Sequence, residues 1–242
     1  MKEKTITINL KRDNWDRRAY LSSVMCDNLE ELTASSAEFL HPSEQLYSQT
    51  LNYERRLNSY LMGRHAAKKA IGQALTNVSA NDIELEFGVF HQPIIKGDTG
   101  NQVEVSISHS DKAAVALAYP TGHPMGIDIE KIDYSKKELF LKQLTEKELG
   151  LLEKLSITQE GGALLLWSVK EALSKALKSG LAADYMVYET KNLKWHGNHL
   201  TGEFIHFAQY RFEAFLLNLH VLAIALPKKT KMDFKGLMGD VF

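Results

Sequence analysis

The sequence predicts an α+β protein that consists of two similar α/β half-domains. Stretches of alternating apolar residues and stretches of helical periodicity follow one another along the whole chain. Two segments also recur: residues 222–227 resemble residues 115–120, and residues 169–177 resemble residues 63–71, at separations of 107 and 106 residues. Pro120-Thr121-Gly122-His123-Pro124 has the composition of a linker. We therefore predict an N-terminal half, residues 1–120, and a C-terminal half, residues 121–242.

The N-terminal half is expected to contain strands and two helices. Ile6, Ile8 and Leu10 alternate with polar residues, which predicts a strand near 4–10. Asn81-Asp82 is a turn signal that opens the next strand. The remaining elements predicted for this half are helices near 42–48 and 52–76 and strands over 83–90, 103–109 and 113–119.

The C-terminal half is expected to begin with a strand over 126–130. Thr145 and Glu148 have the spacing of a capping box at the start of a helix. The other predicted elements are helices near 136–143, 145–154 and 159–178 and strands near 185–194, 200–208 and 218–226. The residues after Pro227 carry four lysines and are expected to be peripheral.

Composition places the chain among soluble globular proteins. It has 242 residues, of which 44% are hydrophobic and 24% charged, with a formal net charge of −1. This charge gives no general attraction to nucleic acid. The single cysteine, Cys26, excludes an internal disulfide and fits a reducing compartment.

The sequence gives no reason to expect a membrane segment. Residues 1–15 alternate in polarity and lack the apolar core of a secretory signal. The most apolar stretch, residues 215–226, is interrupted by Asn218 and His220 and is too short to cross a bilayer. We expect a cytoplasmic protein without a membrane partner.

Two motifs in the C-terminal half carry the chemistry. Asp128 and Glu130 are two residues apart, so on a strand their carboxylates share one face. Glu171 and Lys175 are one helical turn apart. Each motif alone is commonly a half-exposed strand or a surface ion pair. If the helix crosses the strand, however, three carboxylates and an ammonium meet, and such a site suits Mg²⁺ and a phosphorylated substrate.

The order of four motifs resembles that of a known family. Gly63–Lys68, Ser106–Ser110, Gly126–Glu130 and Trp167–Lys175 follow one another as in the larger, Sfp-type class of 4′-phosphopantetheinyl transferases, over roughly residues 55 to 185. The resemblance implies a fold of two similar halves related by a pseudo-two-fold. The presence of both halves in one chain further predicts a monomer.

The resemblance also implies a reaction. Members of this family transfer the 4′-phosphopantetheine group of coenzyme A to a serine of an apo carrier protein and release 3′,5′-ADP. By this resemblance Asp128 and Glu130 bind Mg²⁺, or Mn²⁺, which accepts similar oxygen ligands. Glu171 then ligates the metal, accepts the serine proton or does both, and Lys175 pairs with the pyrophosphate.

Coenzyme A contacts are implied mainly for the N-terminal half. Arg64 and Lys68 correspond to the family's cations for the 3′-phosphate, and Arg56 can join them. His109 is expected against the phosphates, with Ser108 adding a hydrogen bond. The alternative for Arg56, Arg64 and Lys68 is that they form a solvated basic face of a helix. Lys170, in the other half, is expected to be solvated.

One segment departs from the family pattern. Family members commonly carry Gly-Lys-Pro before the Ser-His strand, whereas this chain has His91-Gln92-Pro93. The missing lysine is expected to weaken nucleotide binding, and restoring it with Gln92→Lys is expected to lower the KM for coenzyme A.

Two other functions are compatible with the same motifs. A noncatalytic module that binds coenzyme A or a carrier protein would keep the fold, although it would not need the carboxylates. A Mg²⁺-dependent nucleotide hydrolase would release free phosphopantetheine. A serine hydrolase is disfavoured, because no Gly-x-Ser-x-Gly motif surrounds Ser108-His109. The identity of the carrier protein stays open.

Overall fold

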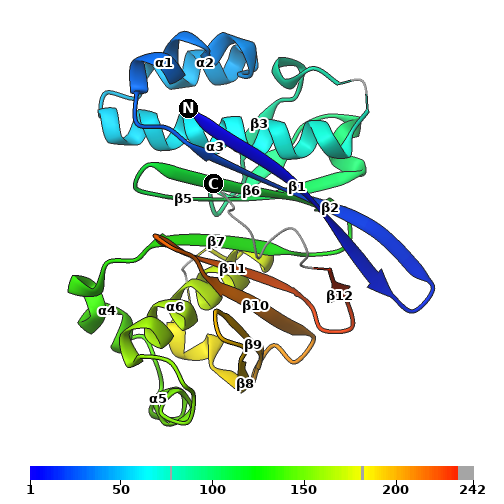
Figure 1. Ribbon diagram of the computed structural model, residues 1–242. Coiled ribbons are helices and arrows are strands. Elements are labelled where there is room, and N and C mark those ends of the chain that lie inside the picture. The colour runs from blue at the N-terminus through cyan, green and yellow to red at the C-terminus, as the bar shows by residue number, and fades with distance from the viewer. Residues whose placement is uncertain (77, 181–182, 234–242) are drawn as a thin grey trace. The chain divides into compact units, whose positions relative to one another are not determined.

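A computed structural model describes residues 1–76, 78–180 and 183–233. The chain forms two compact units (Figure 1). Unit 1 contains residues 1–123 together with residues 230–233, and unit 2 contains residues 124–229. The chain therefore passes from one unit to the other between His123 and Pro124, within the predicted linker.

Unit 1 is built on a five-stranded antiparallel sheet of order β12-β1-β2-β6-β5. A separate two-stranded sheet pairs β3 with β4. The strands are β1 (Lys2–Arg12), β2 (Trp15–Met25), β3 (Leu85–Phe87), β4 (Pro93–Ile95), β5 (Val103–Ser110), β6 (Ala113–Pro120) and β12 (Lys231–Met232).

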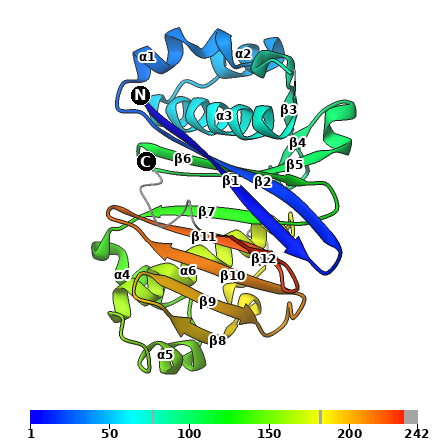
Figure 2. The same cartoon turned by 45° about the vertical axis from the view of Figure 1, so that its right-hand side comes forward.

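Helices cover one face of the unit 1 sheet (Figures 1 and 2). The longest, α3 (Glu54–Ala74), packs on β2, β5 and β6, and Ala66, Ala67 and Ala70 are completely buried in this contact layer. The other helices are α1 (Leu29–Ala34) and α2 (Pro42–Gln49), with 3₁₀ turns η1 (Ser36–Glu38), η2 (Ala80–Asp82) and η3 (Asp98–Asn101).

Unit 2 has the same type of layered structure. Its antiparallel sheet has the order β7-β11-β10-β9-β8, and the long helix α6 packs on β7, β11 and β10. The strands are β7 (Gly126–Lys131), β8 (Thr190–Trp195), β9 (His199–Phe204), β10 (Tyr210–Leu216) and β11 (His220–Pro227). The helices are α4 (Lys137–Leu141), α5 (Glu146–Leu152) and α6 (Gln159–Ala176), with η4 (Tyr134–Lys136) and η5 (Tyr185–Tyr188).

The strand registers confirm that the two units repeat one plan. In unit 1 Ser22 of β2 pairs with Ala116 of β6, and in unit 2 Asp128 of β7 pairs with Ala223 of β11. Each member of the second pair follows its counterpart by 106 or 107 residues, which is the separation found in the sequence. The α+β prediction with two similar halves is confirmed.

A buried glutamate takes the same place in each unit. Glu44 and Glu148 each accept a hydrogen bond from the backbone of their helix N-cap residue, at 2.9 Å in both cases, and so complete a capping box. Each also accepts a backbone N–H from a strand, Leu85 or Thr190. Glu44 then pairs with Arg64 and Lys68 of α3, and Glu148 with Lys170 of α6. The predicted capping box at Thr145 and Glu148 is confirmed.

Some elements differ from the predictions. The strand expected over 83–90 is limited to β3 and forms a hairpin with β4, and the strand expected from 185 begins with the 3₁₀ turn η5. Five helices and strands were missed: β2, α1, β4, β10 and β12. β10 was hidden because no Gly or Pro marks its turn into β11. Leu217 donates its backbone N–H to the His220 carbonyl at 2.9 Å, so the mostly apolar stretch 215–226 contains a hairpin.

The segment after Pro227 is partly structural. Met232 of β12 pairs with Leu10 of β1 and is 6% exposed, so the described part of this segment extends the unit 1 sheet. The prediction that this segment is peripheral is wrong for residues 231–232, because they form an edge strand of the sheet and bury Met232.

Candidate functional site

The predicted crossing of helix and strand in unit 2 is present, and a glycine permits it. Gly126 begins β7 directly beneath α6, and a Cβ atom at this position would overlap the backbone carbonyl of Ala172 and lie 2.6 Å from the amide nitrogen of Ala176. Such an approach of backbone to backbone is possible only for glycine. It brings the polar face of β7 within reach of the side chains of α6.

Asp128 is the buried centre of this crossing. Its side chain is 4% exposed, Ser168 donates a hydrogen bond to Oδ2 at 2.7 Å, and the Lys175 ammonium pairs with Oδ1 at 2.7 Å. Lys175 keeps 28% of its side chain exposed. One ammonium therefore neutralises the buried carboxylate and also reaches solvent, where it can meet an anionic ligand.

Glu171 of α6 lies near Asp128 of β7 and is 8% exposed. Burial raises the pKa of this carboxyl, and the negative charge of Asp128 raises it further, against the opposing effects of Lys175 and of a hydrogen bond from Tyr185. Tyr185 donates that bond to Oε1 at 2.6 Å. The charge of Glu171 is thus disfavoured by its surroundings, which makes the carboxylate a better proton acceptor than an exposed glutamate.

The donor set is chemically suited to a hard divalent cation. Asp128 is close enough to Glu171 to raise the pKa of its carboxyl, and Glu130 follows Asp128 on the same face of β7. The Lys175 ammonium already contacts one oxygen of Asp128, where a cation could bind. Within residues 1–76, 78–180 and 183–233, no group of three or more His, Cys, Asp or Glu side chains has the arrangement of a metal site. The three-carboxylate site therefore stays a prediction.

Lys170 does not lie where the sequence suggested. Its side chain is completely buried, and the ammonium donates to Glu148 at 2.7 Å and to the Gln143 carbonyl at 2.8 Å. It is not solvated, because it is the cation that neutralises the capping-box glutamate of unit 2.

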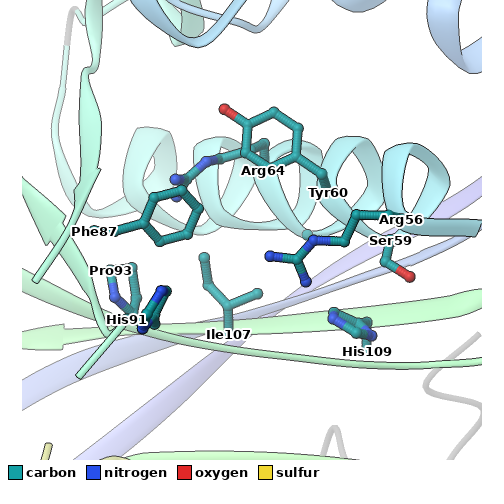
Figure 3. A pocket seen from close by; sticks show the side chains of 10 residues that line it. Arg56, Ser59, Tyr60, Arg64, Phe87, His91, Pro93, Ile107 and His109 are labelled. Carbon is teal, nitrogen blue, oxygen red and sulfur yellow. The ribbon is translucent and has the colours of Figure 1, made fainter. Parts of the chain in front are cut away.

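A basic pocket of about 200 Å³ lies in unit 1 between α3, the β3–β4 hairpin and β5. Figure 3 shows Arg56 and Arg64 on the helix above, with Ile107 and His109 on the strand below. Its ten lining residues include four that can carry positive charge and none that is acidic, namely Arg56, Ser59, Tyr60, Gly63, Arg64, Phe87, His91, Pro93, Ile107 and His109. This composition suits an anion with a planar or apolar portion.

Arg64 is held between two aromatic rings. Its guanidinium carbon lies 4.8 Å from the ring centroid of Phe87 and 5.1 Å from that of Tyr60. Its Nε lies 3.3 Å from Glu44, without the geometry of a hydrogen bond, and the side chain is 4% exposed. Arg64 is therefore a pocket-lining residue whose orientation is fixed by the protein before any ligand binds.

Lys68 takes a different role from the predicted phosphate contact. Its side chain is completely buried, and its ammonium pairs with Glu44 at 2.7 Å and donates to the Ile83 carbonyl. Burial lowers its pKa, which the charge of Glu44 partly offsets. In this arrangement Lys68 is unavailable to a phosphate. Ser108 is also buried, because successive residues of β5 face opposite sides of the sheet, whereas His109 is exposed and lines the pocket.

The segment that departs from the family pattern forms a tight turn at this pocket. His91 has φ = 60°, in the left-handed region where glycine is favoured, and its side chain lines the pocket. The Gln92 side chain instead folds back on the turn, where its Oε1 accepts the Phe90 N–H at 2.9 Å. The residue placed against a ligand is therefore His91, and Gln92 stabilises the turn.

Comparison with known protein families gives a match for one part of the chain. Residues 124–225 match the 4′-phosphopantetheinyl transferase superfamily, and they span nearly all of unit 2. Unit 2 is a 4′-phosphopantetheinyl transferase superfamily domain. The superfamily predicted from the motifs is thereby confirmed, and the Sfp-type class stays a prediction. Comparison with curated protein sequences gave no match.

Three solved structures of this superfamily resemble the chain. A holo-(acyl-carrier-protein) synthase from Bacillus anthracis, crystallised with coenzyme A (3′,5′-ADP), is 27% identical, with a TM-score of 0.37, and the match covers 47% of this chain and 94% of that one. The synthases from Thermotoga maritima and Plasmodium yoelii are 22% and 19% identical, with TM-scores of 0.31 and 0.33. These matches cover 55% and 49% of this chain and 72% and 95% of theirs.

Two residues that contact Asp128 and Glu171 in unit 2 could not be found from the sequence. Ser168 lies inside the quoted helix motif, but nothing in its spacing indicated a bond to Asp128. Tyr185 lies where a strand was expected. In the parts of the chain that the structure describes, no helix combines the length and apolar character needed to cross a bilayer.

Proposed function

We propose that this protein transfers the 4′-phosphopantetheine group of coenzyme A to a serine hydroxyl of an apo acyl or peptidyl carrier protein. The observation that supports this best is the group formed by the buried carboxyl groups of Asp128 and Glu171 and the partly exposed ammonium of Lys175. It lies at the crossing of β7 and α6, inside the part of the chain that matches the superfamily. The basic pocket of unit 1 gives independent support, because it suits a phosphorylated ligand with a planar base.

The transfer requires a nucleophile, a proton acceptor and neutralisation of the leaving group. The serine oxygen forms a bond to the β-phosphorus of coenzyme A, and the bond from that phosphorus to the oxygen of 3′,5′-ADP breaks. Glu171 accepts the serine proton, a role favoured by the raised pKa of its carboxyl. Lys175 reaches solvent and can turn from Asp128 to the pyrophosphate.

A divalent cation is part of the proposal. Asp128, Glu130 and Glu171 are the residues that would hold Mg²⁺, and when bound the ion would draw charge from the pyrophosphate. Ser168 fixes the orientation of Asp128 by its hydrogen bond to Oδ2.

The deciding experiment is mass spectrometry of apo carrier proteins incubated with the protein, coenzyme A and Mg²⁺. We expect a phosphopantetheine adduct on a serine, released 3′,5′-ADP, and loss of both in Asp128→Asn, while circular dichroism shows that this variant still unfolds cooperatively. Glu138→Gln, an exposed acid on α4, is the matched control and should retain transfer. Binding of coenzyme A without transfer to any carrier would instead identify a noncatalytic module, and free phosphopantetheine would identify a hydrolase.

A second experiment tests the proposed 3′-phosphate contact. Arg56→Ala and Arg64→Ala should weaken binding of coenzyme A roughly tenfold to hundredfold, because a hydrogen bond to a charged group is worth about 1.5–3 kcal/mol, and should affect dephospho-coenzyme A much less. Arg56 is the cleaner test, since it is exposed and Arg64 also faces buried Glu44. Equal losses for the two ligands would exclude these arginines from that phosphate.

A further inference from the structure

Glu171 has a partner from outside the superfamily motifs. Tyr185, in the turn η5, donates its hydroxyl to Oε1 of Glu171 at 2.6 Å. We propose that Tyr185 is a positioning residue that fixes the carboxylate of Glu171 for phosphopantetheine transfer. This inference rests on the proposed function, and it adds a residue to which no role in that function has been given.

The Tyr185 ring is held by a ring stack and lies in a capped turn. It stacks on Trp167 of α6, with ring centroids 4.6 Å apart and an interplanar angle of 27°. Trp167 in turn contacts Phe140 of α4, at 5.7 Å between centroids. Asp184 caps the start of η5 by accepting the Met186 N–H at 2.9 Å. The hydroxyl is thus directed by a ring stack and a capped turn, both of which exist without a ligand.

The contact matters because Glu171 is a carboxylate in unfavourable surroundings. It is buried next to the negative charge of Asp128, and the nearby ammonium of Lys175 already pairs with Asp128. Two neighbouring carboxylates tend to turn away from each other or to share a proton. A tyrosine hydroxyl stabilises the anion by one directed hydrogen bond without adding a competing cation. Since the hydroxyl occupies Oε1, Oε2 is the oxygen presented to a proton or a metal ion.

The stack also explains an uncommon feature of Trp167. Its indole Nε1 is buried and, among the described residues, has no hydrogen-bond partner. A buried tryptophan normally finds such a partner. The position of Trp167 is therefore determined by its ring contacts with Tyr185 and Phe140, so one function of this tryptophan is to place the Tyr185 ring.

The test compares Tyr185→Phe with Tyr188→Phe. Both remove one hydroxyl from η5 and keep the ring; the Tyr188 hydroxyl contacts Ser179 at 3.3 Å, and Tyr188 is buried. We expect Tyr185→Phe to lower kcat roughly tenfold or more, because one hydrogen bond to a charged group is lost. The KM for coenzyme A and the thermal midpoint should stay close to those of the wild type. Tyr188→Phe should leave kcat unchanged.

Two further measurements separate positioning from a general structural effect. In a Glu171→Gln background, Tyr185→Phe should change the residual rate less than twofold, because the carboxylate that Tyr185 is proposed to position is already absent. Calorimetric titration with Mg²⁺ alone should show a severalfold weaker affinity in Tyr185→Phe than in wild type or Tyr188→Phe, provided that Glu171 binds the ion.

The outcomes separate this inference from the proposed function. A wild-type protein that transfers nothing to any carrier contradicts the proposed function, whereas the Mg²⁺ titration still tests Tyr185. Wild-type kcat together with wild-type Mg²⁺ affinity in Tyr185→Phe would overturn the positioning role. It would also be overturned if the loss in kcat were as large in the Glu171→Gln background as in the wild type, because Tyr185 would then act on another group.

Discussion

His91 is the residue at which backbone conformation and ligand pocket meet. Its φ of 60° is costly for a residue with a Cβ atom, and glycine stands at the corresponding position of the family pattern. Its side chain points into a pocket that Arg56, Arg64 and His109 also line (Figure 3). A residue that keeps an unfavourable conformation at a binding site is a candidate for a specific ligand contact.

The structure changes the prediction made for this turn. Because Gln92 accepts the Phe90 N–H, Gln92→Lys should loosen the turn and leave the KM for coenzyme A unimproved. His91→Ala keeps the same backbone constraint and removes the imidazole, so it should raise the KM severalfold and leave kcat almost unchanged. Steady-state kinetics of the two variants provide the test. A lower KM in Gln92→Lys with no change in His91→Ala would reverse the assignment of the two side chains.

His65 provides a pH dependence of stability. It occupies on α3 the place that Glu171 has on α6, 106 residues later, and its Nε2 bonds Glu3 at 2.7 Å. Its Nδ1 is buried without a partner among the described residues, and burial lowers the pKa of the imidazole although Glu3 opposes this shift. The pKa of His65 is thus lower in the folded protein than its ordinary value of 6.5 in the unfolded chain. As the pH falls from 6.5 through the folded-state pKa, the unfolded chain binds a proton first, so the folded protein loses stability.

The corresponding variant is His65→Gln, which keeps a donor for Glu3 but does not titrate. We expect its thermal midpoint to fall less between pH 7.5 and about pH 5 than that of the wild type. Scanning calorimetry at several pH values checks this. Parallel curves for the two proteins would show that His65 titrates alike in the folded and unfolded chain.

At the scale of elements, the crossing of β7 and α6 depends on Gly126. Gly126→Ala places a methyl group against the backbone of Ala172 and Ala176, so the helix and strand must separate. We expect a loss of about 1–3 kcal/mol or more in unfolding free energy, typical of overpacking, and lower transfer activity because Asp128 moves away from α6. Denaturant unfolding measures the first effect and the transfer assay the second.

Gly150 offers a matched control within the same unit. It lies in α5, and a Cβ there would meet nothing within 4 Å. Gly150→Ala should therefore stabilise the protein by about 0.5–1 kcal/mol through helix propensity and leave activity unchanged. Equal effects of the two substitutions would mean that the close approach at Gly126 does not constrain the fold.

At the scale of the whole molecule, the two units share a plan but differ in chemistry. Where unit 2 has Asp128, Glu130 and Glu171, the equivalent positions of unit 1 hold Ser22, Val24 and His65. The acidic group thus occurs in one copy of the repeat, and the basic pocket lines the other. If transfer needs both the acidic group and the basic pocket, neither unit should be sufficient.

We therefore expect fragments 1–123 and 124–242 to lack transfer activity when expressed separately. The division matters for folding, because β12 pairs with β1 and is lost from the first fragment. Circular dichroism should accompany the transfer assay, so that an inactive fragment that is folded can be distinguished from an unfolded one. Full activity of either fragment alone would show that transfer does not need both the acidic group and the basic pocket.

The sequence by itself determined the repeat, the long helices and the group of Asp128, Glu171 and Lys175. These follow from local periodicity and from residue spacing within single elements, both of which survive in a one-dimensional pattern. Capping at Thr145 and Glu148 was equally local. The motifs predicted the superfamily, and the match of residues 124–225 confirmed it.

Only the tertiary structure decided which cations are buried and which residues from distant segments complete the site. Lys68 was expected to contact a phosphate and Lys170 to be solvated, yet each neutralises a capping-box glutamate more than 20 residues away. Tyr185 reaches Glu171 through a turn that has no strand or helix pattern. Helical spacing specifies the face of the helix on which a charged residue lies. The oppositely charged partner that offsets the cost of burying this residue comes from another element, and the position of that partner follows from tertiary packing alone.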